Sequence, residues 1–147
     1  MRTVLLAFTI IGVLHGQAAG DNRSKPATPP GEVIPVNESD LRIINRAAQI
    51  LSGESKWNRN DNRDCPSAAT TWSLYCSLYQ ASVEINGKFD HRLGSLEEVR
   101  RSVEQASKGK KYGHRLMGYN NDPATTFADI KKVLSTTAER IAARLNR

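Results

Sequence analysis

The spacing of apolar residues along most of the chain follows the 3.6-residue period of an α-helix. A first amphipathic helix is predicted to begin at Asn37 or Ser39, whose side chains can cap free backbone amides, and to end near Leu51. A last helix is predicted to follow a cap at Thr125 or Thr126 and to continue almost to the end of the chain. Its apolar stripe is Phe127, Ile130, Leu134, Ala138, Ile141 and Leu145. Both patterns are typical of helices that bury one face against a core.

Residues 69–86 predict a second helix that is apolar on two nearly opposite sides. The first stripe consists of Trp72, Cys76, Tyr79 and Val83, and the second of Leu74, Leu78, Ala81 and Ile85. A helix with two apolar sides is normally buried between neighbours. We therefore expect this helix to be the central element of the fold.

Ser95 and Glu98 have the spacing of a capping box, which predicts a third helix that begins there and closes at Gly109. The stretch from Lys108 to Tyr119 supports at most a short helix. No segment has the alternating pattern of a strand. The expected fold is therefore all-α, a small orthogonal or bundle-like domain of four to five helices around a central helix.

The N-terminus has the three regions of a secretory signal peptide. Arg2 supplies positive charge, residues 4–14 form an apolar run that is short for a membrane span, and small residues follow at Ala18 and Gly20. Four prolines then mark a flexible leader. The predicted organisation is a signal peptide over 1–20, a Pro-rich leader over 21–36 and a single helical domain over 37–147. We expect export, either to the periplasm or out of the cell, with no membrane span left after cleavage.

Cysteine usage and charge refine this picture. An exported protein whose only cysteines are Cys65 and Cys76 is expected to pair them, which in chain-entropy terms stabilises the domain by about 3 kcal/mol. The formal net charge is +6, of which Arg2 contributes one, and cationic residues occur in every segment. Because no concentrated basic stripe carries interleaved aromatic residues, we expect no nucleic-acid partner. The expected partner is an anionic or carbohydrate component of the cell envelope, or a protein.

The stretch from Glu54 to Pro66 is almost entirely polar around one tryptophan. Its oxygen-bearing side chains suggest a calcium loop, but it lacks the glycine and the bidentate glutamate that such loops use. Arg59 and Arg63 would also repel the ion. We therefore expect neither a metal nor another cofactor, and we predict a structured loop whose Asn and Asp side chains bond to its own backbone.

This loop and a turn, predicted over Asn120-Asn121-Asp122-Pro123 before the last helix, carry the candidate binding residues. Their amide and carboxylate groups can hydrogen-bond a sugar or a peptide, and Trp57 or Tyr119 can supply an apolar platform. The candidate binding residues are Trp57, Asn58, Asn60, Asp61, Tyr119, Asn120, Asn121 and Asp122. The leading hypothesis is a non-enzymatic exported module that binds or interacts with a partner.

Histidine-based catalysis is the alternative. His91 and His114 are weak candidates for the base of a small envelope hydrolase, acting beside Asp122. No serine of the chain lies in a strained nucleophile motif such as G-x-S-x-G. Loop histidines are more often solvated or hydrogen-bonded than catalytic, so an enzyme is the less favoured interpretation.

Three features of the chain resemble a bacterial family of domains of unknown function, number 6197 in its series. They are Trp57 after the first helix, the segment Trp72-Ser73-Leu74-Tyr75-Cys76-Ser77-Leu78, and the segment Tyr119-Asn120-Asn121-Asp122-Pro123 before the last helix. The resemblance covers about Leu41 to Leu145 and implies the same helical layout, but it implies no activity. Tyr119 stands where the family is expected to carry tryptophan, and the signal peptide and cysteine pair are expected only in exported members.

Overall fold

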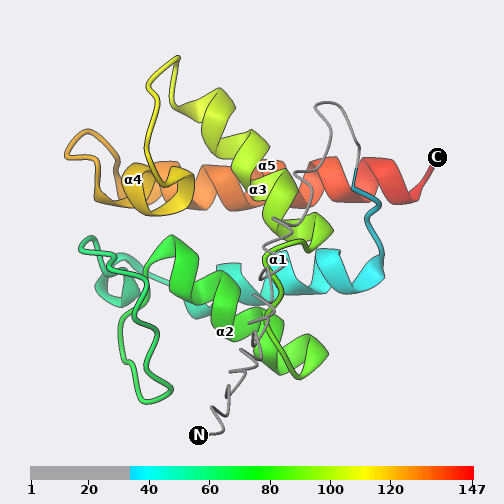
Figure 1. The fold of residues 1–147 in the computed structure, drawn as a ribbon, viewed down its shortest axis with the longest axis horizontal. Coiled ribbons are helices and arrows are strands. Elements are labelled where there is room, and N and C mark those ends of the chain that lie inside the picture. Colours follow the sequence, from blue (N-terminus) through cyan, green and yellow to red (C-terminus); the bar gives the residue numbers. More distant parts are fainter. Residues whose placement is uncertain (1–33) are drawn as a thin grey trace, which may run out of the picture. The chain divides into compact units, whose positions relative to one another are not determined.

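The computed structural model describes residues 34–147, which contain five α-helices and one 3₁₀ turn joined by loops (Figure 1). The elements are α1 (Glu38–Ile50), η1 (Glu54–Lys56), α2 (Leu74–Asn86), α3 (Gly94–Ala106), α4 (Arg115–Asn121) and α5 (Phe127–Leu145). Within these residues the only β-type pairing is an isolated bridge between Trp57 and Trp72. The prediction of an all-α fold is therefore confirmed. The predicted signal peptide over 1–20 and nearly all of the predicted leader over 21–36 lie outside the described residues.

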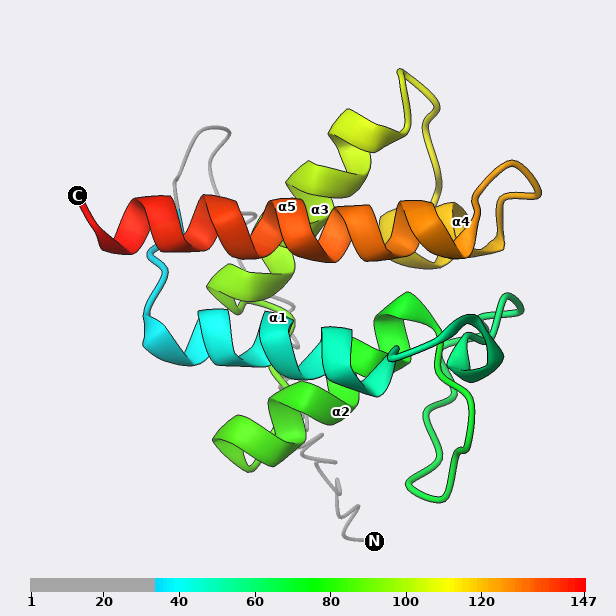
Figure 2. The ribbon, with the colours of Figure 1, turned by 180° about the vertical axis from the view of Figure 1, so that it is seen from behind.

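The two helices α1 and α5 run antiparallel, side by side, as Figures 1 and 2 both show. Helix α2 packs across α1, helix α3 packs across α5, and the short helix α4 contacts both α2 and α3. Completely buried core side chains come from all four long helices and include Ile43, Ile44, Leu51, Leu74, Leu78, Val99, Ile130 and Ile141. No helix within residues 34–147 is long and apolar enough to cross a membrane.

The most extensively packed helix is α1, and this differs from the expectation that the second helix is central. Helix α1 packs against α2, α3 and α5, whereas the main contacts of α2 are with α1 and α4. The N-terminal half of α2 is nevertheless buried on every side, from Leu74 to Leu78. Both apolar stripes of α2 are needed in this half because it is covered on all sides, whereas residues 83–86 are partly or fully exposed.

Helix α2 begins at Leu74, five residues later than predicted. The backbone of Trp72 is already used outside the helix, because its N–H donates to the carbonyl of Lys56 (2.7 Å) and its carbonyl accepts from the N–H of Asn58 (2.9 Å). Ser73 then caps the helix, with its side chain accepting from the N–H of Cys76 (3.0 Å). Because Trp72 pairs with Lys56 and Asn58, which are distant in sequence, the helix begins only after it, although the local pattern is helical from residue 69.

The caps of the first and last helices are those predicted. Asn37 forms a capping box with Asp40 at the start of α1. Thr126 forms a second one with Asp129 at the start of α5. Each box satisfies backbone donors that the first turn of a helix leaves without partners.

The capping box predicted for Ser95 and Glu98 is wrong. Among the described residues, helix α3 has no side-chain cap of its own and the buried hydroxyl of Ser95 has no hydrogen-bond partner. The carboxylate of Asp40, on α1, takes its place: one oxygen accepts from the N–H of Ser95 (2.7 Å) and the other from the N–H of Asn37 (3.0 Å). One buried carboxylate thus caps two helices and fixes the start of α3 against α1.

Glu98 has a different role, because its side chain points into the fold with only 1% of the residue exposed. Its carboxylate accepts from Arg101 (3.1 Å) on α3 and from Arg140 (3.0 Å) and Arg144 (2.6 Å) on α5. A buried carboxylate needs such compensation, since removal from water is costly. The guanidinium groups of Arg140 and Arg144 therefore fix the crossing of α3 and α5, and that of Arg101, on α3 itself, adds to the compensation of the buried charge.

Close packing at Gly94 provides a test of this helix arrangement. A Cβ atom at Gly94 would lie 2.6 Å from the carbonyl oxygen of Pro35 and 2.9 Å from Asp40 Oδ2. Gly94→Ala is therefore expected to lower the free energy of unfolding by about 2 kcal/mol, measured by urea titration. The matched control is Gly113→Ala, where a Cβ atom would have no neighbour within 4 Å. Equal stability of the two variants would contradict the packing described.

Candidate functional site

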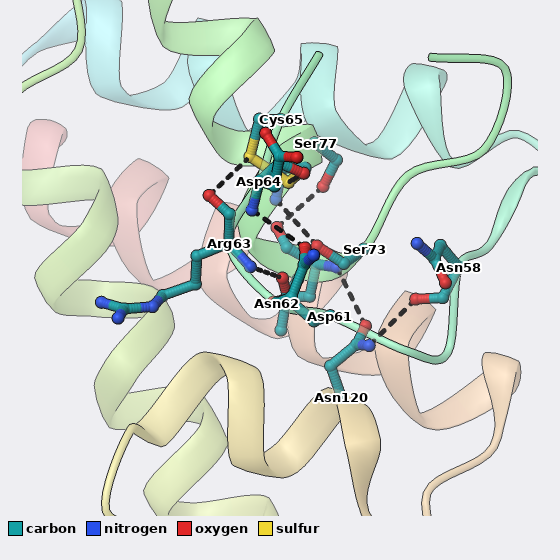
Figure 3. The surroundings of a disulfide bond; sticks show 11 residues. Asn58, Asp61, Asn62, Arg63, Asp64, Cys65, Ser73, Ser77 and Asn120 are labelled. Carbon is teal, nitrogen blue, oxygen red and sulfur yellow. Dashed lines mark hydrogen bonds between the residues drawn. A yellow bond between two sulfur atoms is a disulfide. The ribbon is translucent and has the colours of Figure 1, made fainter.

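The polar stretch after α1 is a closed loop over residues 57–73. Its two ends are joined by the bridge between Trp57 and Trp72. The predicted pairing of the cysteines is confirmed, since a disulfide links Cys65 in the loop to Cys76 in the first turn of α2 (Figure 3). The loop is thus anchored at both ends and near its middle.

Asn120 of α4 holds this loop to the helical core. The residue is completely buried, and its Oδ1 accepts from the indole N–H of Trp57 (2.8 Å) and from the backbone N–H of Leu74 (3.0 Å). Its Nδ2 donates to the carbonyls of Asn58 (3.0 Å) and Arg59 (3.2 Å). Figure 3 shows the side chain reaching from α4 toward the loop backbone. One amide therefore joins the start of the loop, the start of α2 and α4.

Asn121 repeats this arrangement one residue later. Its Oδ1 accepts from the backbone N–H of Asp61 (2.8 Å), and its Nδ2 donates to the carbonyl of the same residue (2.8 Å). The loop and the Asn-Asn pair, separated by some sixty positions in sequence, are therefore neighbours. The sequence predicts a turn over residues 120–123, but Asn120 and Asn121 form the end of α4 and Asp122 is its C-cap.

Inside the loop, the Asn and Asp side chains bond to the backbone two residues ahead, as predicted. Asn58 accepts from the N–H of Asn60 (2.9 Å), Asp61 from that of Arg63 (2.7 Å), and Asn62 from that of Asp64 (3.0 Å). Asx turns of this kind stabilise irregular backbone. Here they support a left-handed residue at Arg63 (φ 63°).

The loop encloses a hollow of about 330 Å³, here called the loop hollow. Its polar lining residues are two aspartates, three asparagines and three hydroxyl residues: Asp61, Asp64, Asn58, Asn60, Asn62, Thr70, Thr71 and Ser73. No Lys, Arg or aromatic side chain of the described part of the chain lines it. The hydroxyl residues were not among the predicted binding residues, because Thr70 and Thr71 fell inside the stretch predicted as helix.

Asp61 is the most buried charged group of the loop hollow, with 6% of the residue exposed. One carboxylate oxygen accepts from the N–H of Arg63, whereas the other, Oδ2, is buried with no hydrogen-bond partner among the described residues. Buried carboxylate oxygens normally have donors. This oxygen is therefore the most unusual polar atom of the loop.

Trp57 contributes its ring to the fold rather than to the lining of the loop hollow. The ring lies 6.1 Å from that of Phe127, and the guanidinium of Arg59 lies 5.1 Å from its centroid. Arg59 also donates to the carbonyls of Pro123 and Thr125. This corner joins the loop to the start of α5.

Asp122 belongs to another cluster, on the segment that connects α4 with α5. Its carboxylate accepts from the N–H of Ala124 (2.8 Å), the ammonium of Lys110 (2.9 Å) and the hydroxyl of Tyr112 (2.7 Å). These hydrogen bonds, that of Ala124 first, lower the pKa of Asp122 to about 2. The group is therefore charged at any physiological pH.

The two histidines contact groups other than Asp122. His114 is half-buried, with Nε2 3.1 Å from Arg63 Nη1 and its ring edge-on to Tyr75 at 6.2 Å. Burial, and then the charge of Arg63, lowers the pKa of His114. His91 is exposed, with its ring edge-on to Phe89 at 4.8 Å. Within residues 34–147 neither histidine is hydrogen-bonded to Asp122, so the contact that the hydrolase hypothesis requires is not supported.

No cluster of three or more His, Cys, Asp or Glu side chains within the described part of the chain is arranged to hold a metal ion. The structure thus brings Trp57, Asn58, Asp61, Asn120 and Asn121 together, while Tyr119 and Asp122 lie near Tyr112 and Lys110.

Removal of the Asn120 amide tests its role as the anchor of the loop. Asn120→Ala would leave two buried donors, of Trp57 and Leu74, without an acceptor, so the free energy of unfolding is expected to fall by about 3 kcal/mol. The indole N–H of Trp57 should also exchange faster with solvent by NMR. The control is Asn45→Ala, an exposed position on α1. If the two variants are equally stable, the amide does not anchor the loop.

Comparison with known proteins gives one match. Residues 35–140 match the family of unknown function DUF6197. The matched region includes α1 to α4 and most of α5. No curated protein and no solved structure matches the chain. The match includes the disulfide-closed loop, Asn120 and the start of α5 that together form the corner described above. The chain therefore belongs to the family DUF6197, as its tryptophan and Asn-Asn-Asp segments predict.

Proposed function

We propose that the mature chain is an exported, non-enzymatic binding module that holds a small polar ligand, of the carbohydrate type, in the loop hollow. The observation that carries this proposal is the buried Asp61 Oδ2, which has no donor within residues 34–147, in a polar concavity of about 330 Å³. A ligand that offers O–H or N–H groups would supply the missing donor.

The charge of the residues that line the loop hollow favours a carbohydrate over an anionic ligand, the two envelope components expected from the sequence. Two carboxylates and no cationic side chain line the loop hollow, although the chain as a whole carries a formal charge of +6. An anionic ligand would be repelled there. The amides and hydroxyls can both donate and accept, which matches the mixed donors and acceptors of a sugar.

A rigid frame favours binding because the free site needs little ordering when the ligand arrives. The loop hollow has such a frame in the Cys65–Cys76 disulfide, the bridge at its base and the amide of Asn120. In this proposal Trp57, Asn120 and Asn121 hold the loop in shape, and the residues of the lining contact the ligand.

Export is proposed on the sequence of the N-terminus and on the paired cysteines. Disulfides persist in oxidising compartments and are rare in the cytosol. The family region also begins at residue 35, after the predicted signal peptide and most of the leader.

Asp61→Asn tests the proposed site directly. The variant keeps an acceptor for the N–H of Arg63 but presents a donor where Oδ2 lay. We expect glucose, N-acetylglucosamine or glucosamine to shift the amide resonances of residues 58–73 saturably in ¹⁵N NMR titrations. The affinity of the sugar that binds should fall at least about tenfold in the variant.

Asp90→Asn is the matched control, because Asp90 forms the same type of Asx turn, with the N–H of Arg92 (2.9 Å), at an exposed position outside the loop. This control should bind the sugar as the unaltered chain does. Absence of saturable shifts with all three sugars, or undiminished affinity in Asp61→Asn, would contradict the proposal.

The mass of the intact protein from its native host tests export. We expect loss of about the first twenty residues, and alkylation of Cys65 and Cys76 only after reduction. A full-length mass with both thiols alkylated without reductant would show that the protein stays in a reducing compartment. This result would leave the sugar titration unaffected.

A further inference from the structure

A second hollow, apart from the loop hollow, lies between the C-terminal end of α3, the N-terminal half of α5 and the side of α4. It measures about 370 Å³ and is lined in part by Ala106, Lys108, Tyr119, Asp129, Lys132 and Val133. An adjoining hollow of about 230 Å³ shares four of these residues, so the two form one groove, here called the Tyr119 groove. None of its lining residues belongs to the loop hollow.

Tyr119 forms the floor of this groove, since it lines both hollows although only 5% of the residue is exposed. Its hydroxyl has no hydrogen bond to any other group of residues 34–147, whereas the hydroxyl of Tyr112 donates to Asp122. Burial raises the pKa of Tyr119 to about 12, so the phenol keeps its proton. The groove therefore has a hydrogen-bond donor at its base.

Two ammonium groups stand on its rim. Lys108 and Lys132 line the groove, and neither forms an ion pair within the described part of the chain. Lys110, in contrast, is paired with Asp122 (2.9 Å). The lining also includes one carboxylate, Asp129, whose Oδ2 accepts from the N–H and the hydroxyl of Thr126. The two cations and one anion of the larger hollow leave a single positive charge.

The walls of the groove are partly apolar. The side chains of Ala106 and Val133 and the ring of Tyr119 provide nonpolar surface next to the two lysines. A ligand that satisfies the whole lining needs one negative charge, an acceptor for the phenol and a small apolar body. A carboxylate attached to an aliphatic or aromatic group has all three.

We propose that the Tyr119 groove is a second binding site of this protein, for a small monocarboxylate whose charge is held between Lys108 and Lys132 and whose carboxylate accepts from the hydroxyl of Tyr119. The site does not depend on the proposed function of the loop hollow, since the two share no lining residue and differ in the sign of their charge.

Titration with benzoate, followed by ¹⁵N NMR, tests this site, with benzamide as the neutral probe of the same shape. Benzoate should shift the amides of residues 102–108, 119 and 129–136 saturably, and benzamide should bind at least about tenfold more weakly. Lys108→Gln and Lys132→Gln should each weaken benzoate binding at least about fivefold, and Tyr119→Phe should weaken it while leaving the spectrum of the fold intact.

Lys88→Gln, which removes an exposed lysine outside the groove, is the matched control and should leave benzoate binding unchanged. Asp61→Asn should also leave it unchanged, which separates this site from the loop hollow. Equal binding of benzoate and benzamide, no saturable shifts with benzoate, or full affinity in both lysine variants would overturn the proposal.

Discussion

The buried amide of Asn120 is the interaction on which the loop corner of this fold depends. The polar loop brings to the core many backbone groups that no helix or sheet satisfies, and such groups are costly to bury without partners. Asn120 uses its oxygen on two donors, of Trp57 and Leu74, and its nitrogen on the carbonyls of Asn58 and Arg59. An amide suits this position because it donates and accepts at once. A carboxylate would lack the donors, and an apolar residue would leave both sides unsatisfied.

Two buried carboxylates join the long helices to one another by hydrogen bonds in a comparable way. Asp40 caps α1 and α3 together, and Glu98 joins α3 to α5 through Arg140 and Arg144. In both cases one group satisfies partners from two helices, so the geometry of the crossing is fixed by directional bonds as well as by apolar packing. A carboxylate buried without any of these partners would be strongly destabilising, because its charge would have no compensation.

Helix α4 relates the two hollows. Asn120 and Asn121 bond to the loop that forms one hollow, and the preceding residue, Tyr119, forms the floor of the other. Consecutive residues of a helix point about 100° apart, so one short helix can serve surfaces that face different ways. The two hollows carry opposite charge, acidic in the loop and basic in the groove, which suits them to different ligands.

Local patterns were sufficient wherever a helix is decided by its own sequence. The caps at Asn37 and Thr126, the stripes of the first and last helices, and the Asx turns of the loop all involve residues within four positions of one another. The pairing of Cys65 with Cys76 followed from the number of cysteines and the expected compartment. These features, together with the all-α class and the family resemblance, could be predicted from the sequence.

The remainder depends on contacts between distant residues, which local periodicity does not contain. Only the tertiary structure starts α2 at Leu74, because Trp72 pairs with η1 and its flank. Only the tertiary structure shows that the first turn of α3 is capped by Asp40, which lies 55 positions earlier, and not by a capping box of Ser95. The candidate residues of the loop and of α4 were predicted from their residue types alone. The packing of α4 decides that Asn120 and Asn121 hold the loop, whereas Tyr119 lines the other hollow. The sequence by itself therefore determined which segments are helical and the caps of the first and last helices. The tertiary structure decided where α2 and α3 begin, which polar side chains are used within the fold and which line a hollow, because burial and hydrogen bonding are properties of the assembled chain.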